Sequence, residues 1–383
     1  MQGCYLDYNA TSPMPQAVVE AMLPYFAEKA GNPASVHGAG RAARDGLEQA
    51  RRQIAAMVGV HFSQVIFTSG GTEANNLALL GLVPQGDKPG HLIISAIEHP
   101  SVLRVAEALE ARGITVSRIS PDSQGVVQAE KVAAEITSET FLVSIMAVNN
   151  ETGVVQPLSD IADLCAERQV AFHSDAIQWM GRRPLDMEQI PVKLLSLSGH
   201  KFGGPKGVGA LVVDRALAPH PQLLGGGQER GRRSGTENLA GIVGMGAAAQ
   251  WASDHMDEEQ SRLAALRNQL EQQVLQALPQ TVVIGQGADR LANTSLMGFP
   301  GLDGETLVMN LDLAGFAVSS GSACSSGRTE ASHVLRAMGV DDSVARGAIR
   351  FSLGWQTREA DIERLGHNVV QTIRRLQAMA GVG

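Results

Sequence analysis

A single lysine stands where an apolar run gives way to a turn rich in glycine and proline. Residues 194–197 predict a buried strand, and Lys201 follows in Ser198-Gly199-His200-Lys201-Phe202-Gly203-Gly204-Pro205-Lys206-Gly207. Ligands of open α/β sheets bind outside the carboxyl ends of strands. A lysine there can pair with an anion, or lose its proton and form a Schiff base with a carbonyl. Most lysines in such turns are simply solvated, but Ser198 and His200 beside this one favour a ligand with an aldehyde and a phosphate.

A second candidate for chemistry is a cysteine in a loop of serines and glycines. Cys324 lies in Ser319-Ser320-Gly321-Ser322-Ala323-Cys324-Ser325-Ser326-Gly327, which has few apolar anchors. Structural cysteines are usually buried, so an unremarkable exposed thiol is the weaker interpretation. A nucleophilic cysteine needs thiolate character and access, and such a loop provides access and reach. We therefore predict that Cys324 is a nucleophile.

Further polar residues follow other predicted strands. Asp175 ends the strand 170–175, one helix-plus-strand unit before Lys201, so adjacent parallel strands could hold both residues. His99 follows the strand 92–97, and Asn149-Asn150 follows the strand 141–148. A lone Asp is often a turn former and a lone His is often structural. Their shared position at strand ends favours a common site.

Two glycine-containing segments could bind anions. The strand 65–69 runs through Gly70-Gly71-Thr72 into a helix over 73–80, and free N–H groups at a helix start attract phosphate. This turn matches neither the dinucleotide fingerprint nor the P-loop, and an ordinary α/β turn is an equally good interpretation. Residues 224–236 contain several glycines and arginines and end at Thr236, before a helix over 237–251. That segment is either a solvated loop or a second anion site.

Composition excludes several classes of protein. The chain has 383 residues and a net charge of −8, which argues against a nucleic-acid partner. No apolar run approaches the length of a membrane span, and the N-terminus does not resemble a signal peptide. The three cysteines, Cys4, Cys165 and Cys324, have no CxxC spacing, which predicts a reducing cytoplasm without a disulfide framework or a metal site. Cys165 shares a helix face with apolar residues and is predicted to be a core residue.

The order of predicted elements indicates two structural units. Strands and helices alternate through the first two thirds of the chain, which predicts an α/β unit with a mostly parallel sheet over residues 15–255. The polar residues 254–260 suggest a break, after which a separate helix carries Leu263, Leu266, Leu270 and Val274 at helical spacing. Residues 256–383 then form a smaller α+β unit, which we expect to include the N-terminal arm, residues 1–14.

Taken together, these motifs resemble those of cysteine desulfurases of the NifS/IscS-like branch, pyridoxal-phosphate (PLP) enzymes of the class V aminotransferase family. The resemblance is carried by the runs 198–207 and 319–324 and extends from Leu6-Asp7-Tyr8-Asn9-Ala10-Thr11 to at least Gly354. It implies the aspartate aminotransferase-like fold (fold type I), with a mostly parallel seven-stranded sheet in a large PLP-binding domain and a smaller α+β domain. Trp355 departs from the pattern, because many relatives carry a basic residue there.

The resemblance also implies roles for individual residues. Lys201 would form the Schiff base with PLP, Asp175 would pair with the ring nitrogen, and His99 would stack on the ring and assist proton transfer. Arg350 and Asn32 would bind the substrate, with Arg350 on its carboxylate. Thr236 would act across the interface of a homodimer, on the phosphate of the other subunit. The remaining cofactor contacts would come from Gly71, Thr72, Asn150, Gln178, Ser198 and His200.

The implied reaction removes sulfur from L-cysteine, giving L-alanine and a persulfide on Cys324. An iron–sulfur scaffold or another acceptor protein would receive the sulfur, and Cys324 could transiently ligate an iron–sulfur cluster with such a partner; no resident metal is expected. Two alternatives stay open. An aminotransferase, lyase or selenocysteine lyase on this fold would need Lys201 but not Cys324, and a non-catalytic binding protein would need neither.

Overall fold

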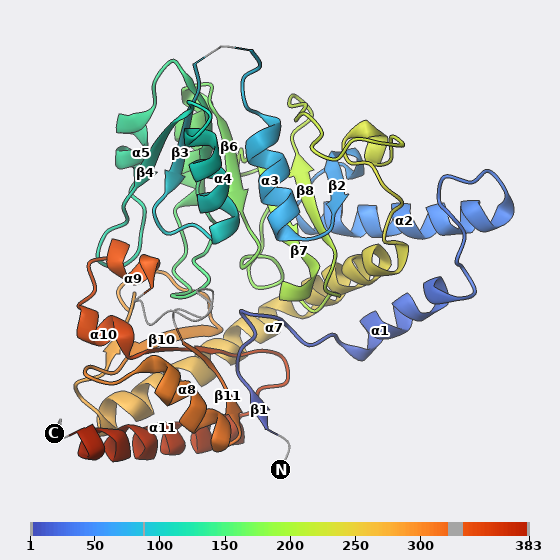
Figure 1. Ribbon diagram of the computed structural model, residues 1–383. Coiled ribbons are helices and arrows are strands. Elements are labelled where there is room, and N and C mark those ends of the chain that lie inside the picture. Colours follow the sequence, from blue (N-terminus) through green and yellow to red (C-terminus); the bar gives the residue numbers. More distant parts are fainter. Residues whose placement is uncertain (1–2, 87–88, 321–331, 381–383) are drawn as a thin grey trace.

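A seven-stranded sheet forms the centre of the larger part of the molecule (Figure 1). The computed structural model describes residues 3–86, 89–320 and 332–380. Within them β8 alone runs antiparallel to its neighbours in this sheet, so the predicted mostly parallel seven-stranded sheet is confirmed. In spatial order the strands are β2 (Val65–Thr68), β8 (Gly209–Val213), β7 (Leu194–Ser198), β6 (Ala171–Asp175), β5 (Thr140–Ser144), β3 (His91–Ser95) and β4 (Thr115–Ile119).

Alternate residues of these strands enter two different cores. Ile93 packs in a cluster with α2 (Gly38–Met57), α5 (Ala129–Glu135), α6 (Leu158–Glu167) and the start of α7 (Leu239–Ala277). Its neighbours Leu92 and Ile94 pack on the other face, against α3 (Gly71–Gly81) and α4 (Pro100–Glu110). Helices on both faces explain why the strands read as continuous apolar runs. Cys165 is buried in the first cluster, as predicted.

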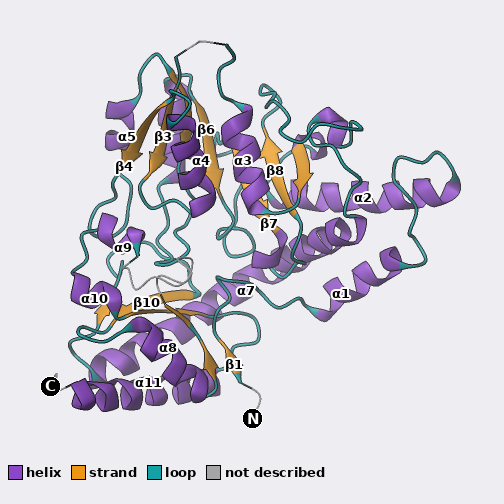
Figure 2. Cartoon of the chain, viewed as in Figure 1, coloured by secondary structure: helices purple, strands orange, loops and turns teal. Residues whose placement is uncertain are grey.

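A smaller antiparallel sheet lies beside the large one, in the lower part of Figure 2. Its order is β12 (Ser319–Ser320), β13 (Ala348–Ser352), β10 (Thr294–Gly298) and β9 (Val282–Val283). It packs with α8 (Gly304–Leu313), α11 (Glu359–Ala380) and the end of α7 around a core of its own. The N-terminal arm joins this core through Leu6, and β1 (Cys4–Tyr5) pairs in parallel with β11 (Phe316–Ala317).

The expectation of two separate helices on either side of residues 254–260 is wrong, because α7 is one helix of 39 residues. Its buried residues up to Ala252 belong to the large core, and those from Leu263 onward belong to the small core. The stretch between them is polar because it passes between two cores, and it contains no glycine or proline that would end a helix. The domain boundary at residue 255 stays a prediction, since α7 runs through it.

The remaining elements are short. Helix α1 (Gln16–Met22) continues into the 3₁₀ turn Leu23–Phe26, and other 3₁₀ turns are Phe62–Gln64, Gly199–Lys201 and Glu229–Gly231. Helices α9 (His333–Ala337) and α10 (Asp342–Arg346) contribute Val334, Leu335 and Ala345 to the cluster that contains Ile93. Neither α8 nor α10 was predicted from the sequence. In the described part of the chain, no helix combines the length and the hydropathy that crossing a membrane requires.

We predict that one buried histidine limits stability in acid. The ring of His173 on β6 lies between Ser144 Oγ at 2.8 Å and Ser196 Oγ at 2.9 Å, and burial lowers its pKa to about 3. The unfolded chain takes up this proton near pH 6.5, so the stability contributed by neutral His173 is present above that pH and is lost as pH falls toward 3. The loss is at most about 1.4 kcal/mol per pH unit. Urea unfolding at pH 7 and pH 5 measures it.

A His173→Gln variant keeps a polar side chain but cannot take up this proton. We expect it to lose less stability than the wild type between pH 7 and pH 5, whatever its stability at pH 7. The exposed His220 provides the matched control, and His220→Gln should keep the wild-type pH dependence. An identical slope for His173→Gln and wild type would contradict the prediction.

Candidate active site

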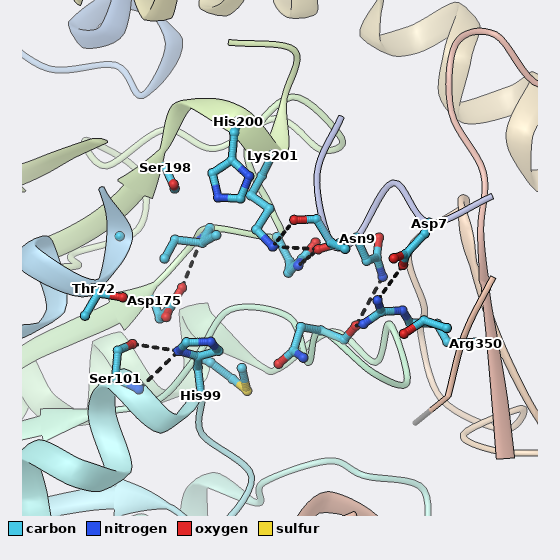
Figure 3. A pocket seen from close by; sticks show the side chains of 17 residues that line it. Asp7, Asn9, Thr72, His99, Ser101, Asp175, Ser198, His200, Lys201 and Arg350 are labelled. Atoms are coloured by element: carbon cyan, nitrogen blue, oxygen red, sulfur yellow. Dashed lines mark hydrogen bonds and ion pairs between the residues drawn. The ribbon is translucent and has the colours of Figure 1, made fainter. Parts of the chain in front are cut away.

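One cavity, of about 480 Å³, gathers most of the residues that the sequence singled out (Figure 3). It lies beyond the carboxyl ends of β6 and β7, facing the small sheet, and Asp7, Asn9 and Ala10 of the N-terminal arm line it as well. The predicted residues in its lining are Gly71, Thr72, His99, Asn150, Asp175, Gln178, Ser198, His200, Lys201 and Arg350. Most of the residues predicted at the ends of strands therefore line one cavity.

Three predicted residues are not in this lining. Asn32 is exposed between α1 and α2, where its Oδ1 accepts a hydrogen bond from Ala34 N at 2.8 Å. Thr236 lines a separate cavity of about 110 Å³ beside the end of β2. Cys324 lies outside the described residues, although Ser319, on β12, lines the main cavity. The roles of all three stay predictions. Within the described ranges, no group of three or more His, Cys, Asp or Glu side chains could hold a metal ion.

Lys201 ends the 3₁₀ turn that follows β7, and its amine contacts the N-terminal arm. Nζ donates to the carbonyl oxygens of Asn9 at 2.6 Å and Ala10 at 2.9 Å. The Nε2 amide of Gln178 donates to the same Asn9 oxygen at 2.9 Å. The arm thus provides neutral acceptors for an ammonium group, and the amine stays at the cavity wall.

A hydrogen-bonded chain connects Asp175 to His99. Asn75 Nδ2 donates to Asp175 Oδ2 at 2.7 Å and to Ser101 Oγ at 2.8 Å, and Ser101 Oγ lies 2.8 Å from His99 Nδ1. The backbone N–H of Ser101 also donates to His99 Nδ1. Since Nδ1 accepts, the neutral ring carries its proton on Nε2. Burial lowers the pKa of His99, which favours that neutral ring.

The start of α3 forms one wall of the cavity. Gly70 caps this helix without a side-chain hydrogen bond, which leaves the first N–H groups for a ligand. A Cβ at Gly71 would overlap the end of the Ile177 side chain, which would have to shift to admit a larger residue. Thr72 is exposed at this end, and Ser198 and His200 line the same cavity. Burial and the neighbouring Lys201 lower the pKa of His200 to about 4, so its ring is neutral.

Arg350 reaches the cavity from β13 of the small sheet. Its Nη2 pairs with Asp7 Oδ1 at 2.7 Å, and its Nη1 donates to the Asn150 carbonyl at 2.9 Å. Its Nε is buried and has no hydrogen-bond partner among the described residues. A buried donor without an acceptor is costly, so this guanidinium favours an anionic ligand beside it.

Four polar residues in or beside the cavity were not predicted from the sequence: Asn75, Ser101, Asn9 and Arg182. Asn75 lies one helical turn after Gly71, and this spacing placed it on the same helix face as the predicted phosphate turn. Asn9 contacts Gln178 and Lys201 through its backbone carbonyl. Every residue type has this group, so the sequence does not show the contact. Arg182 follows Gln178 by one turn, but Arg183 beside it looks the same in the sequence.

Known proteins resemble this chain along almost its whole length. The model of the aminotransferase class-V family matches residues 4–365. "Cysteine desulfurase 2" of Trichormus variabilis is 42% identical over 99% of this chain and 95% of its own length. "Cysteine desulfurase IscS" of Dictyoglomus turgidum is 40% identical over 98% of this chain and 96% of its own length.

Solved structures are similar over the same range. A structure named "NIFS-like protein" has a TM-score of 0.92 and 35% identity, covering 97% of this chain and all of that one. A structure titled "SspA in complex with cysteine" has a TM-score of 0.81 and 34% identity, covering 91% of this chain and 98% of that one. With a family model that spans almost the whole sequence and a relative that is 42% identical over nearly its full length, this chain belongs to the class-V aminotransferase family.

Proposed function

We propose that this protein is a cysteine desulfurase that depends on PLP. The observation that carries the proposal is the convergence of Lys201, Asp175, His99 and Arg350 on one cavity. Relatives that align along almost the whole chain are named cysteine desulfurases, and a similar solved structure is titled as a complex with cysteine. The substrate would be L-cysteine, and the products L-alanine and a persulfide on Cys324.

The residues of the cavity fit the cofactor. The open start of α3, with Thr72, Ser198 and His200, offers N–H and hydroxyl groups for the phosphate. Asp175 is buried, accepts one hydrogen bond on each oxygen, and lines the cavity, so it can also accept from a protonated ring nitrogen. Lys201 would hold the aldehyde carbon, with His99, Asn150 and Gln178 around the ring. When bound, PLP supplies an electron sink next to the substrate Cα.

The protein's own residues would then handle the substrate and its protons. Arg350 would bind the substrate carboxylate through its unpartnered Nε and orient Cα toward Lys201. The Lys201 amine would move the Cα proton, with His99 holding a proton on Nε2. The Cys324 thiolate would attack the substrate sulfur. In balance, the substrate Cβ–S bond breaks, an S–S bond forms on Cys324, and hydrogen replaces sulfur on Cβ to give alanine.

The finer predictions about partners belong to this proposal. The persulfide would pass to an iron–sulfur scaffold or another sulfur-acceptor protein, a hypothesis that the relatives named IscS support. A reducing, cytoplasmic setting suits a protein that carries sulfur on a free thiol. The protein would be a homodimer, in which Thr236 contacts the phosphate of the partner's site. The position of Thr236 outside its own chain's main cavity is consistent with that arrangement.

The first prediction separates a desulfurase from a lyase that does not use Cys324. With L-cysteine and a thiol reductant, the wild type should release alanine and sulfide in equal amounts. Cys324→Ala should release neither, because no thiol accepts the sulfur, yet it should keep the yellow colour of bound PLP. Lys201→Ala should lose the activity together with the spectrum of the lysine-bound cofactor. Alanine release by Cys324→Ala at the wild-type rate would contradict the role of Cys324 and favour a lyase.

The second prediction tests Thr236 across the interface. Subunits carrying Lys201→Ala are mixed with subunits carrying Thr236→Ala, and dimers are allowed to exchange. If Thr236 acts in trans, each mixed dimer contains one intact site, and the 1:1 mixture should gain about a quarter of the wild-type activity. If Thr236 acts within its own chain, no site in the mixed dimer is intact. The activity of the mixture should then equal the average of the activities of the two variants measured separately.

A further inference from the structure

Arg182 is a cation whose hydrogen bonds all go to neutral oxygens. It donates to Tyr8 O at 3.2 Å, Lys201 O at 3.4 Å and Gln178 O at 3.2 Å, and also to Gln178 Oε1. In the described part of the chain it forms no ion pair. The residue is partly exposed, but its guanidinium points inward, and burial with the nearby Arg350 lowers its pKa to about 9. Burying a cation without an anionic partner costs free energy. The segments that its hydrogen bonds hold in place therefore indicate what this residue does.

The acceptors belong to three segments that meet at the cavity. Tyr8 is on the N-terminal arm, Gln178 is on the turn after β6, and Lys201 is on the turn after β7. Arg182 occupies the oxygen of the Gln178 amide, so the amide nitrogen is left to donate to Asn9 O. That same Asn9 oxygen accepts from Lys201 Nζ. Arg182 therefore fixes both the arm and the amide that shares an acceptor with the lysine.

We propose that Arg182 is a positioning residue for Lys201: it fastens the N-terminal arm to the lysine turn, so that the carbonyls of Asn9 and Ala10 hold the amine ready for the cofactor aldehyde. This inference rests on the proposed function, because it assumes that Lys201 bonds to PLP. It adds a role for Arg182, which does not touch the reacting atoms, and for the carbonyls of Asn9 and Ala10, which accept hydrogen bonds from Lys201 Nζ itself. Without Arg182 the arm loses a hydrogen bond at Tyr8, and the Gln178 side-chain amide is free to rotate. The Asn9 carbonyl, and with it the Lys201 amine, would then no longer be held in one position.

The neighbouring arginine provides a matched control. Arg183 pairs with Asp289 at 2.7 Å on the surface and does not line the cavity. Arg182→Gln and Arg183→Gln therefore make the same chemical change one residue apart. Arg182→Lys is the conservative variant, because an ammonium keeps the charge and offers three donors to the same oxygens.

The experiment measures capture of the cofactor rather than turnover. Full-length proteins are stripped of cofactor and mixed with PLP, and the rise of the visible band gives the capture rate. Binding of pyridoxamine phosphate, which has the ring and phosphate but no aldehyde, is measured in parallel. We expect Arg182→Gln to capture PLP at least tenfold more slowly, while its affinity for pyridoxamine phosphate changes less than threefold. Arg182→Lys should stay within threefold of wild type in both, and Arg183→Gln should match wild type.

Each other outcome has a definite meaning. Equal weakening of PLP and pyridoxamine phosphate by Arg182→Gln would make Arg182 a merely structural residue, and unchanged capture would also overturn the proposal. If Arg182→Gln does not fold, Arg182→Lys is compared with the wild type in the same two assays, and equal weakening of PLP capture and pyridoxamine phosphate binding would overturn the proposal. Failure of the wild type to capture PLP would instead overturn the proposed function.

Discussion

The parallel pairing of β6 with β7 sets the distance between the two groups on which the proposed chemistry depends. Asp175 pairs with Ser196, so both strands end at the same edge and the lysine turn begins just beyond. The chain then returns antiparallel as β8, which requires a tight turn. Gly203 in that turn has φ +90°, and a Cβ there would stand 3.0 Å from Pro15 Cδ. Lys201 therefore lies between the end of the sheet and a turn in which position 203 favours glycine.

The N-terminal arm gives this edge its second wall. Asn9 is 1% exposed and connects both units: its N–H donates to Ser352 Oγ, its Nδ2 to Thr294 Oγ1, and its carbonyl accepts from Gln178 and Lys201. Leaving one such buried group unpaired costs about 1–3 kcal/mol, so the arm has little freedom to shift. Because Asp7 pairs with Arg350, the arm also fixes the spacing between the proposed substrate anchor and the lysine.

The site residues that were predicted from the sequence stand at or just after the ends of strands, where the fold brings them to one edge of the sheet. Lys201, Asp175 and His99 each follow a strand of one parallel sheet, and parallel strands bring their ends together wherever the chain runs between them. Asn75 bonds to Asp175, and Arg182 bonds to Tyr8 and Lys201 as well as to the nearby Gln178. Because most of these partners are far away in the sequence, residue type alone did not reveal the two roles. Residues 254–260 of α7 led to the wrong prediction of two separate helices. A helix that passes from one core to another is polar between them, and its composition there resembles that of a linker.

Charge explains why this cavity suits a ligand with a phosphate and a carboxylate. Lys201, Arg350 and the nearby Arg182 supply positive charge, and Asp7 and Asp175 offset part of it. Two further acids lie close by, but burial raises the pKa of Glu98 to about 8 and that of Glu151 to about 7. A raised pKa favours the protonated form of both acids, so near neutral pH they add less negative charge than two ionised acids. The cavity is therefore positive on balance and attracts anionic groups, although it contains Asp175. The Asp175 carboxylate can accordingly pair with a protonated ring nitrogen while the site still binds anions.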